Sequence, residues 1–223
     1  MTGAPPDLAA RLRGFGPAGI LAIVVIVGAG VFLGAIASAV LVLIWAGLSR
    51  TPWRELGFVR PRSWVRTIAL GVVFGAAFKV LMKAVVMPLL GADPINRAYH
   101  YLAGNRAALP GILFAVVVGG GFAEETFFRG YLFERLRKLL GNGRAATIAM
   151  VLATSALFAA AHYADQGVAG TEQAAVTGLV FGSIFAATGS LWFPIFAHAA
   201  FDVAAVALIY WDVETQVAHL VFK

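Results

Sequence analysis

The chain has 223 residues, of which 61% are hydrophobic and 13% are charged, and it contains no cysteine. Because soluble domains carry about 25% charged residues, this composition disfavours a soluble domain and favours a membrane protein. The lack of cysteine excludes disulfides, thiolate metal ligands and a cysteine nucleophile. The net charge of +6 lies mostly in short basic segments between apolar runs, which indicates membrane topology and not nucleic acid as a partner.

The first apolar segment runs from about Pro17 to Leu48 without a charged residue. It is longer than the ~20 residues that cross the hydrocarbon core but shorter than two full crossings. We therefore expect one long, tilted helix, and the alternative is a helical hairpin that turns near Gly28 and Gly30. The run is far too long for the apolar part of a cleaved signal peptide, so we expect it to be retained.

The linker from Ser49 to Arg66 is the best candidate for a cytoplasmic loop. Its one acidic residue is Glu55, and its two prolines would break a helix. Five arginines give it a strong positive charge: Arg50, Arg54, Arg60, Arg62 and Arg66. A second basic segment, at 135–144, also indicates the cytoplasmic side. Arg11 and Arg13 fall on the opposite side if the first segment crosses the membrane once.

The rest of the chain predicts five more helices, which gives an all-α, polytopic bundle of about six spanning helices. The second helix carries Lys79 and Lys83 on one face, where they either snorkel or point into the bundle. The third helix ends in an amphipathic stretch that a glycine-rich turn at 141–143 terminates. The expected bounds are about 65–90, 110–140, 144–162, 174–188 and 194–211, with a loop at 163–173 and a turn at 189–194.

Six ionisable residues lie in or at the ends of these helices, where each costs at least about 2.5 kcal/mol. They are Glu124, Glu125, Arg129, His162, His198 and Asp202. Glu125 and Arg129 are four residues apart and can pair. Glu124 is then left without an in-helix partner, which suits a general base. His198 and Asp202 share the same spacing, so Asp202 can orient the imidazole ring.

Helix geometry predicts that these groups meet inside the bilayer. Glu124 and His162 lie on either side of the turn at 141–143, and both are roughly 25–29 Å from it. The fifth helix rises only about 22 Å, so its turn is expected below the membrane surface and His198 returns toward the level of Glu124. Taken singly, each feature has a structural explanation, such as a neutralised ion pair or an interhelical clamp. Their joint presence at compatible depth indicates a site.

Three motifs make this sequence resemble a known family. Residues 124–129 read EETFFR and match EExxxR, residues 158–162 read FAAAH and match FxxxH, and residues 198–202 read HAAFD and match HxxxN/D. The sequence is similar to the CAAX protease and bacteriocin-processing family, which includes the type II CAAX prenyl endopeptidases. We divide the chain accordingly into an N-terminal tail (1–16), N-terminal transmembrane helices with the basic linker (17–110), a family-like core (111–213) and a C-terminal tail (214–223).

The resemblance implies an intramembrane endopeptidase in which Glu124 activates water. His162 and His198 would assist, and Asp202 would hold either the oxyanion or the His198 ring. Because an ionised carboxylate cannot donate a hydrogen bond, we expect Asp202 to orient His198. The supporting members of the site would be Glu125 and Arg129.

The family has been described both as metal-dependent and as glutamate-dependent. Glu124, His162 and His198 form a reasonable zinc set with an open fourth position, but no HExxH motif is present, so zinc stays the minority interpretation. The resemblance implies a multi-pass protein of the cytoplasmic membrane that contacts lipid. Its substrate would be a peptide or a lipidated protein, through CAAX-type processing or through maturation of peptides such as bacteriocins.

Two other function classes compete with hydrolysis. A non-enzymatic immunity or scaffold protein would use the same polar cluster only to lock helices together. A transporter or proton channel would use it as a relay, but such proteins are often built from inverted repeats and the sequence contains none that we can find. Hydrolysis therefore ranks first and transport last.

Overall fold

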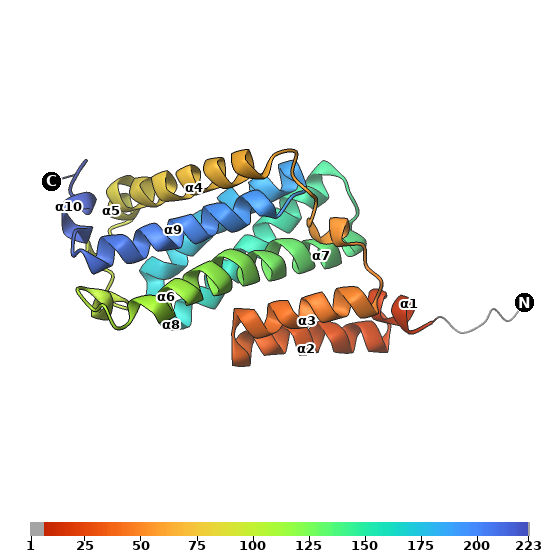
Figure 1. Ribbon diagram of the computed structural model, residues 1–223. Coiled ribbons are helices and arrows are strands. Elements are labelled where there is room, and N and C mark those ends of the chain that lie inside the picture. The colour runs from red at the N-terminus through yellow and green to blue at the C-terminus, as the bar shows by residue number, and fades with distance from the viewer. Residues whose placement is uncertain (1–6, 223) are drawn as a thin grey trace, which may run out of the picture.

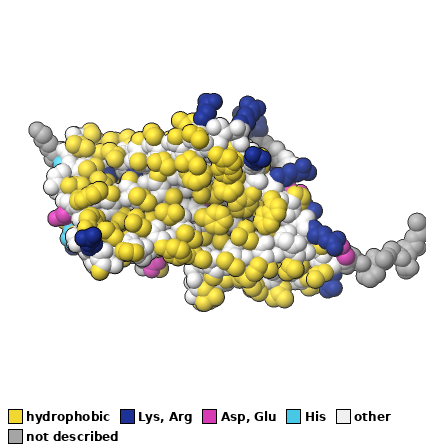
Figure 2. Space-filling model, viewed as in Figure 1, with side chains coloured by type: hydrophobic (Ala, Val, Ile, Leu, Met, Phe, Trp, Pro, Cys, Tyr) yellow, Lys and Arg dark blue, Asp and Glu magenta, His cyan; other side chains and the backbone are white. Residues whose placement is uncertain are grey.

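The computed structural model describes residues 7–222, so residues 1–6 of the N-terminal tail and residue 223 of the C-terminal tail lie outside the described part. Within residues 7–222 the chain is helical and contains no strand (Figure 1). Four helical segments are long and apolar enough to cross a membrane, at 64–89, 109–140, 144–188 and 192–210. Hydrophobic side chains cover the long face of the bundle, while Lys and Arg gather mainly at one end (Figure 2). These findings confirm the predicted polytopic helical bundle.

The first apolar segment is a helical hairpin. After the short helix α1 (Leu8–Arg13), α2 (Pro17–Leu33) and α3 (Ala35–Leu48) lie side by side and are joined by Gly34 (Figure 1). The backbone φ of Gly34 is 90°, a conformation that glycine adopts at little steric cost. Ser38 Oγ donates a hydrogen bond across the hairpin to the Ile26 carbonyl, at 3.0 Å. The expected single tilted helix is therefore wrong, and the turn lies beyond the alternative position near residues 28 and 30.

The hairpin returns the chain to the end from which it started. The Arg13 guanidinium binds the Glu55 carboxylate at 2.7 Å, and the Trp45 indole donates to the Leu12 carbonyl at 3.1 Å. The N-terminal arginines consequently lie at the same end of the bundle as the basic linker. This arrangement removes the conflict in sidedness that a single crossing would create.

The linker contains one 3-10 turn, η1 (Trp53–Leu56), and leads to α4 (Trp64–Leu81). A π-helical turn, η2 (Met82–Val86), and α5 (Met87–Leu89) continue α4, so the predicted second helix is confirmed. Two glycines let α4 approach α9 (Trp192–Tyr210) closely. A Cβ on Gly75 would lie 2.0 Å from the Ala197 carbonyl oxygen, and one on Gly71 would lie 2.9 Å from the Cβ of Phe196. Small residues are the usual device for such contacts in membranes.

The predicted third helix is also confirmed, as one rod. After the 3-10 turn η3 (His100–Leu102), the rod begins with α6 (Leu109–Phe114), continues as the π-helix η4 (Ala115–Leu132) and ends with α7 (Phe133–Leu140). The wider turns of a π-helix are frequent at functional sites. Glycines again permit close approach, because a Cβ on Gly121 would lie 2.7 Å from the Cβ of Ala199. The rod therefore packs directly against the segment of α9 that carries His198.

The long helix α8 (Arg144–Thr188) is bent back on itself at Gly167, where φ is 62° and ψ is −157°. Ser155 lies opposite Gly178, and Val151 lies opposite Gly182, so the two halves run antiparallel. They correspond to the predicted fourth and fifth helices. The predicted loop at 163–173 is wrong, because that segment is helical on both sides of the bend. A turn at Gly189 leads to α9, and α10 (Glu214–Ala218) follows.

Candidate active site

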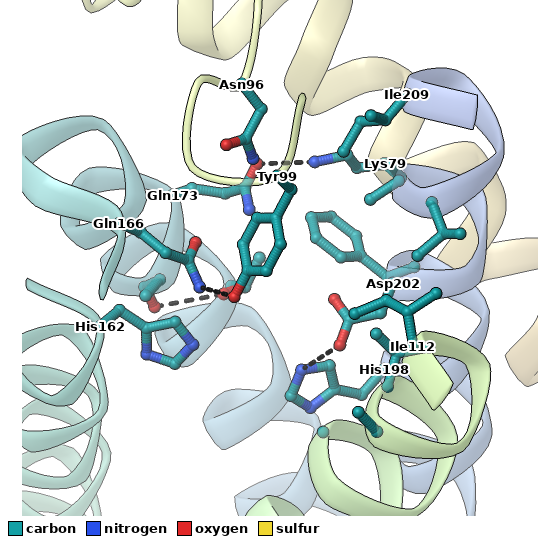
Figure 3. Close-up of a pocket in the computed structure, with 18 of the residues that line it drawn as sticks. Lys79, Asn96, Tyr99, Ile112, His162, Gln166, Gln173, His198, Asp202 and Ile209 are labelled. Carbon is teal, nitrogen blue, oxygen red and sulfur yellow. Dashed lines mark hydrogen bonds and ion pairs between the residues drawn. The ribbon is translucent and has the colours of Figure 1, made fainter. Parts of the chain in front are cut away.

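Four of the six predicted site residues line one cavity. It has a volume of about 190 Å³ and is bordered by η4, both halves of α8, α9 and the loop before α6. Glu124, His162, His198 and Asp202 line it. Figure 3 shows His162 on one wall, facing His198 and Asp202 on the other. The structure thus brings together side chains from helices that lie far apart in the sequence.

Glu125 and Arg129 stand outside the cavity wall and are buried. Arg129 Nη1 donates to Glu125 Oε1 at 2.9 Å, and their side chains are 1% and 0% exposed. The Arg129 guanidinium also lies 4.5 Å from the centre of the Phe158 ring and donates to the Gly178 carbonyl at 3.4 Å. Arg129 therefore ties η4 to both halves of α8.

The His198 ring is held between carboxylates. Its Nδ1 lies 2.8 Å from Glu125 Oε1, whereas its Nε2 lies 3.5 Å from Asp202 Oδ2 and 3.8 Å from Glu124 Oε2. Because Glu125 is paired with Arg129, it can only accept a hydrogen bond, so the proton lies on Nδ1 of His198. Nε2 then faces the two carboxylates of the cavity. The hydrogen bond that orients this ring comes from Glu125, and Asp202 lies near the other ring nitrogen.

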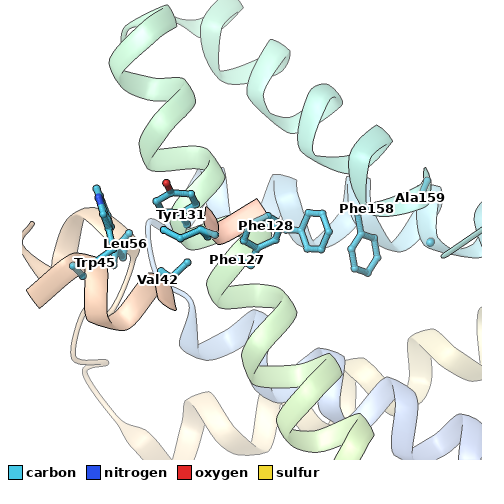
Figure 4. Packing of buried hydrophobic residues seen from close by; sticks show 11 residues of the cluster. Val42, Trp45, Leu56, Phe127, Phe128, Tyr131, Phe158 and Ala159 are labelled. Carbon is cyan, nitrogen blue, oxygen red and sulfur yellow. The ribbon is translucent and has the colours of Figure 1, made fainter. Parts of the chain in front are cut away.

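His162 is oriented by its own helix. Its Nδ1 lies 2.8 Å from the Phe158 carbonyl oxygen, which can only accept, so Nδ1 donates and Nε2 is left for another contact. The Phe158 ring lies 4.5 Å from the His162 ring and 5.8 Å from the His198 ring. Phe158 also belongs to a buried cluster that extends through Phe128 to Trp45 (Figure 4). The FxxxH spacing therefore supplies a packed wall beside both imidazoles.

The two carboxylates of the cavity are accessible, unlike Glu125. The Glu124 side chain is 21% exposed and that of Asp202 is 26% exposed. Among residues 7–222, no side chain donates a hydrogen bond to Glu124, whose nearest ionisable partner is His198. Glu124 therefore has lone pairs free to accept a proton from a molecule in the cavity.

Sequence reasoning missed several polar residues of the cavity wall. Lys79 is 5% exposed, and its ammonium donates to Gln173 Oε1 at 2.8 Å. Gln166 donates to the Tyr99 hydroxyl at 3.4 Å (Figure 3). Burial, reinforced by the nearby Asp165 carboxylate, raises the pKa of Tyr99, so its hydroxyl keeps its proton. The charge of Lys79 within an apolar helix could have indicated a place in the site. Gln166 and Gln173 gave no such indication, because their segment was predicted to be a loop.

The zinc set that the sequence allows as a minority interpretation does not form a compact ligand cluster among the described residues. No three His, Cys, Asp or Glu side chains in the described part of the chain are grouped closely enough to hold a metal ion. Nδ1 of His162 and Nδ1 of His198 donate to the Phe158 carbonyl and to Glu125, which leaves Nε2 of each ring available. In the described part of the chain, Glu124, His162 and His198 are nevertheless not gathered into a preformed metal site, and the chemistry below uses their own acid and base groups.

Residues 106–204 match the family model described as type II CAAX prenyl endopeptidase Rce1-like. All three motifs lie inside this segment. This segment of 99 residues is similar to the Rce1-like family. The match confirms the resemblance and, at the level of the family, supports a CAAX-type endopeptidase that is integral to a membrane. No curated protein and no solved structure matches the chain.

Proposed function

We propose that the chain hydrolyses peptide bonds within the membrane, with Glu124 as the base that activates water. One observation carries the proposal: an accessible carboxylate without a hydrogen-bonding side chain shares a cavity with His162 and His198. In the Rce1-like family the same three motifs occur together, which supports this assignment over a structural role.

The chemistry needs one base that later acts as an acid. Glu124 would take a proton from water while the water oxygen bonds to the scissile carbonyl carbon, and the carbonyl π electrons move onto its oxygen. The tetrahedral intermediate then collapses, the C–N bond breaks, and the proton on Glu124 passes to the leaving amine. The immediate products are a carboxylic acid and an amine. The second proton of the water passes from the new carboxyl group to the amine, which leaves a carboxylate and an ammonium group, and Glu124 regains its starting state.

The developing oxyanion needs hydrogen-bond donors. Ionised Asp202 cannot donate, so other groups of the cavity wall must do so. The Tyr99 hydroxyl is protonated and lines the cavity, and His162 can donate from Nε2 when it is protonated. We propose that these two residues donate hydrogen bonds to the oxyanion. We propose that Asp202 interacts with Nε2 of His198.

Glu125 and Arg129 act through His198. Because Glu125 accepts from Nδ1 of His198, it fixes the orientation of the ring, with Nε2 directed toward Glu124 and Asp202. Arg129 in turn fixes Glu125. We class both as positioning residues, since neither lines the cavity.

The substrate class follows from the family and the membrane setting. A peptide or a lipidated protein segment would reach the cavity within the bilayer, through processing of prenylated CAAX proteins or through maturation of peptides such as bacteriocins. A metal ion is not required by the proposed steps. Hydrolysis should therefore persist in EDTA, whereas loss in EDTA and recovery with Zn²⁺ would establish a metal enzyme.

The decisive experiment compares purified protein in lipid vesicles with two site variants on a reporter peptide library. Glu124→Gln and His198→Ala should lower the rate by about 10²–10⁴-fold, because general acid–base groups contribute that much. Asp212→Asn removes an exposed carboxylate outside the cavity and serves as the matched control. Equal rates for wild type and Glu124→Gln would remove the proposal. Retention of a biological effect by Glu124→Gln would favour the scaffold alternative.

A further inference from the structure

The ionisable residues divide between the two ends of the bundle. One end, here called the basic end, holds α1, the linker, the end of α7 and the start of α8. Contacts join these pieces, since Arg135 and Lys138 both donate to the Arg13 carbonyl, and Arg13 binds Glu55. The cations of the basic end are Arg11, Arg13, Arg50, Arg54, Arg60, Arg62, Arg66, Arg135, Arg137, Lys138 and Arg144.

The other end, here called the polar end, holds the loop between α5 and α6, the bend of α8, the end of α9 and α10. The Gly104 amide donates to the Tyr210 carbonyl, and the Asn96 amide donates to Glu214. The segment α4–α5, about 39 Å long at 1.5 Å per residue, separates this end from the linker. Within residues 7–222, the cations at this end are Lys83, Arg97 and Arg106, against the acids Asp93, Asp165, Glu172, Asp212 and Glu214.

The catalytic cavity opens toward the polar end. Its wall there is made by the loop before α6 and the bend of α8, through Asn96, Tyr99 and Gln166 (Figure 3). A second cavity of about 270 Å³ shares Lys79, Asn96, Gln166 and Gln173 with the first and reaches the exposed pair of Asp93 and Arg97. Among the described residues, none of the basic-end cations lines either cavity.

Membrane proteins keep Lys- and Arg-rich short loops in the cytoplasm. We infer that the basic end is cytoplasmic and that the catalytic cavity therefore opens on the non-cytoplasmic face. The substrate is then a peptide segment, free or lipid-anchored, that is presented from that face. The statement about the substrate rests on the proposed function, whereas the orientation of the bundle does not.

The hairpin strengthens this inference. With a single crossing, Arg11 and Arg13 would lie on the opposite side of the membrane from the linker arginines. The distribution of Lys and Arg would then place cationic segments on both sides and would not predict one orientation. Because α2 and α3 turn back at Gly34, every cationic segment near the N-terminus falls on one side. Within the described chain, the distribution of Lys and Arg between the two ends then predicts a single orientation, with the basic end in the cytoplasm.

The absence of cysteine makes the orientation directly measurable, since one introduced thiol is the only thiol. Arg60→Cys reports on the exposed linker, and Tyr101→Cys reports on the exposed loop of the polar end, outside both cavities. A membrane-impermeant maleimide added to intact cells should label Tyr101→Cys, and should label Arg60→Cys only after permeabilisation. Val168→Cys, 62% exposed beside the bend, is a second reporter for the polar end. The reverse pattern, or labelling of both ends before permeabilisation, would overturn the inference.

An assay in sealed vesicles tests the orientation of the bundle and the proposed hydrolysis independently. A membrane-impermeant reporter peptide should be cleaved by right-side-out vesicles and not by inverted ones, until detergent opens them. Cleavage by inverted vesicles alone would overturn the inference while leaving the proposed function intact. An absence of cleavage even in detergent, together with the expected labelling, would contradict the proposed function and leave the orientation standing.

Discussion

The α2–α3 hairpin and the bundle from α4 to α9 bury different kinds of side chain. The hairpin has no ionisable residue between Pro17 and Leu48, and it packs on η4 through apolar side chains, among them Val42 and Trp45, whose ring lies 5.0 Å from that of Tyr131. The bundle buries charges, in pairs such as Glu125–Arg129 and Lys83–Glu214. The turn at Gly34 and apolar packing stabilise the hairpin. The bundle is stabilised partly by buried charges that also form the site. Substitutions in the hairpin should therefore change stability alone, and substitutions of buried charges should change both stability and chemistry.

The largest effect should come from Arg129→Met. It leaves Glu125 charged, buried and without its partner, so the free energy of unfolding should fall by about 3–5 kcal/mol. His198 also loses its fixed acceptor, so hydrolysis should fall with it. Denaturant unfolding in detergent and peptide hydrolysis measure the two effects.

A double variant sharpens this prediction. Glu125→Gln combined with Arg129→Met leaves no uncompensated charge, so it should recover part of the lost stability without recovering hydrolysis. Recovery of both stability and hydrolysis would show that the pair only supports the fold. Recovery of neither would show that the buried, unpaired charge of Glu125 is not the main cause of the lost stability.

A smaller effect is expected from Gly34→Ala. The glycine has a φ of 90° and a ψ of 171°, a region almost restricted to glycine, so alanine should cost about 1–3 kcal/mol. A Cβ there meets no atom within 4 Å, so the cost is conformational. Gly28→Ala, which is helical and equally uncrowded, is the matched control and should raise stability by about 0.5–1 kcal/mol. Hydrolysis per folded molecule should be unchanged in both, and a loss in Gly34→Ala would contradict the division between the two regions.

Ser38→Ala should cost about 1 kcal/mol, the usual net contribution of one hydrogen bond. Its hydroxyl is buried and bonds across the hairpin to the Ile26 carbonyl. Thermal unfolding should shift downward while the hydrolysis rate stays constant. A larger loss would mean that the hairpin depends on polar contacts more than on apolar packing.

The smallest effect should come from Val31→Ala on the outer face of α2. Val31 is 72% exposed, so its removal opens no cavity, and stability should stay within about 0.5 kcal/mol of wild type. Measured in lipid vesicles, a clearly larger loss would indicate that another molecule covers this face.

The sequence predicts the helices well because each is an apolar run that a turn or a charged segment interrupts. The pairing of Glu125 with Arg129 also follows from the chain alone, since both lie on one helix. The turn at Gly34 was not predicted, because a glycine in an apolar run is compatible with both a helix and a break. The bend at Gly167 was hidden for the opposite reason, since polar residues on both sides of it resemble a loop.

The partner of His198 depends on how the helices pack, which local spacing cannot reveal. Asp202 is four residues away on the same helix, yet Glu125 makes the short hydrogen bond from another helix. Lys79 lies outside the family motifs, and only the folded chain brings it to Gln173. The groups that the sequence missed are those that reach the site from other parts of the chain.

Phe158 has a mechanical consequence. The rings of His162 and His198 and the guanidinium of Arg129 all rest against its single benzene ring. A displacement of that ring would shift these three groups together, so the two imidazoles and the arginine that pairs with Glu125 cannot be adjusted one at a time. One aromatic side chain therefore couples the positions of both imidazoles to that of Arg129, although it takes no part in proton transfer.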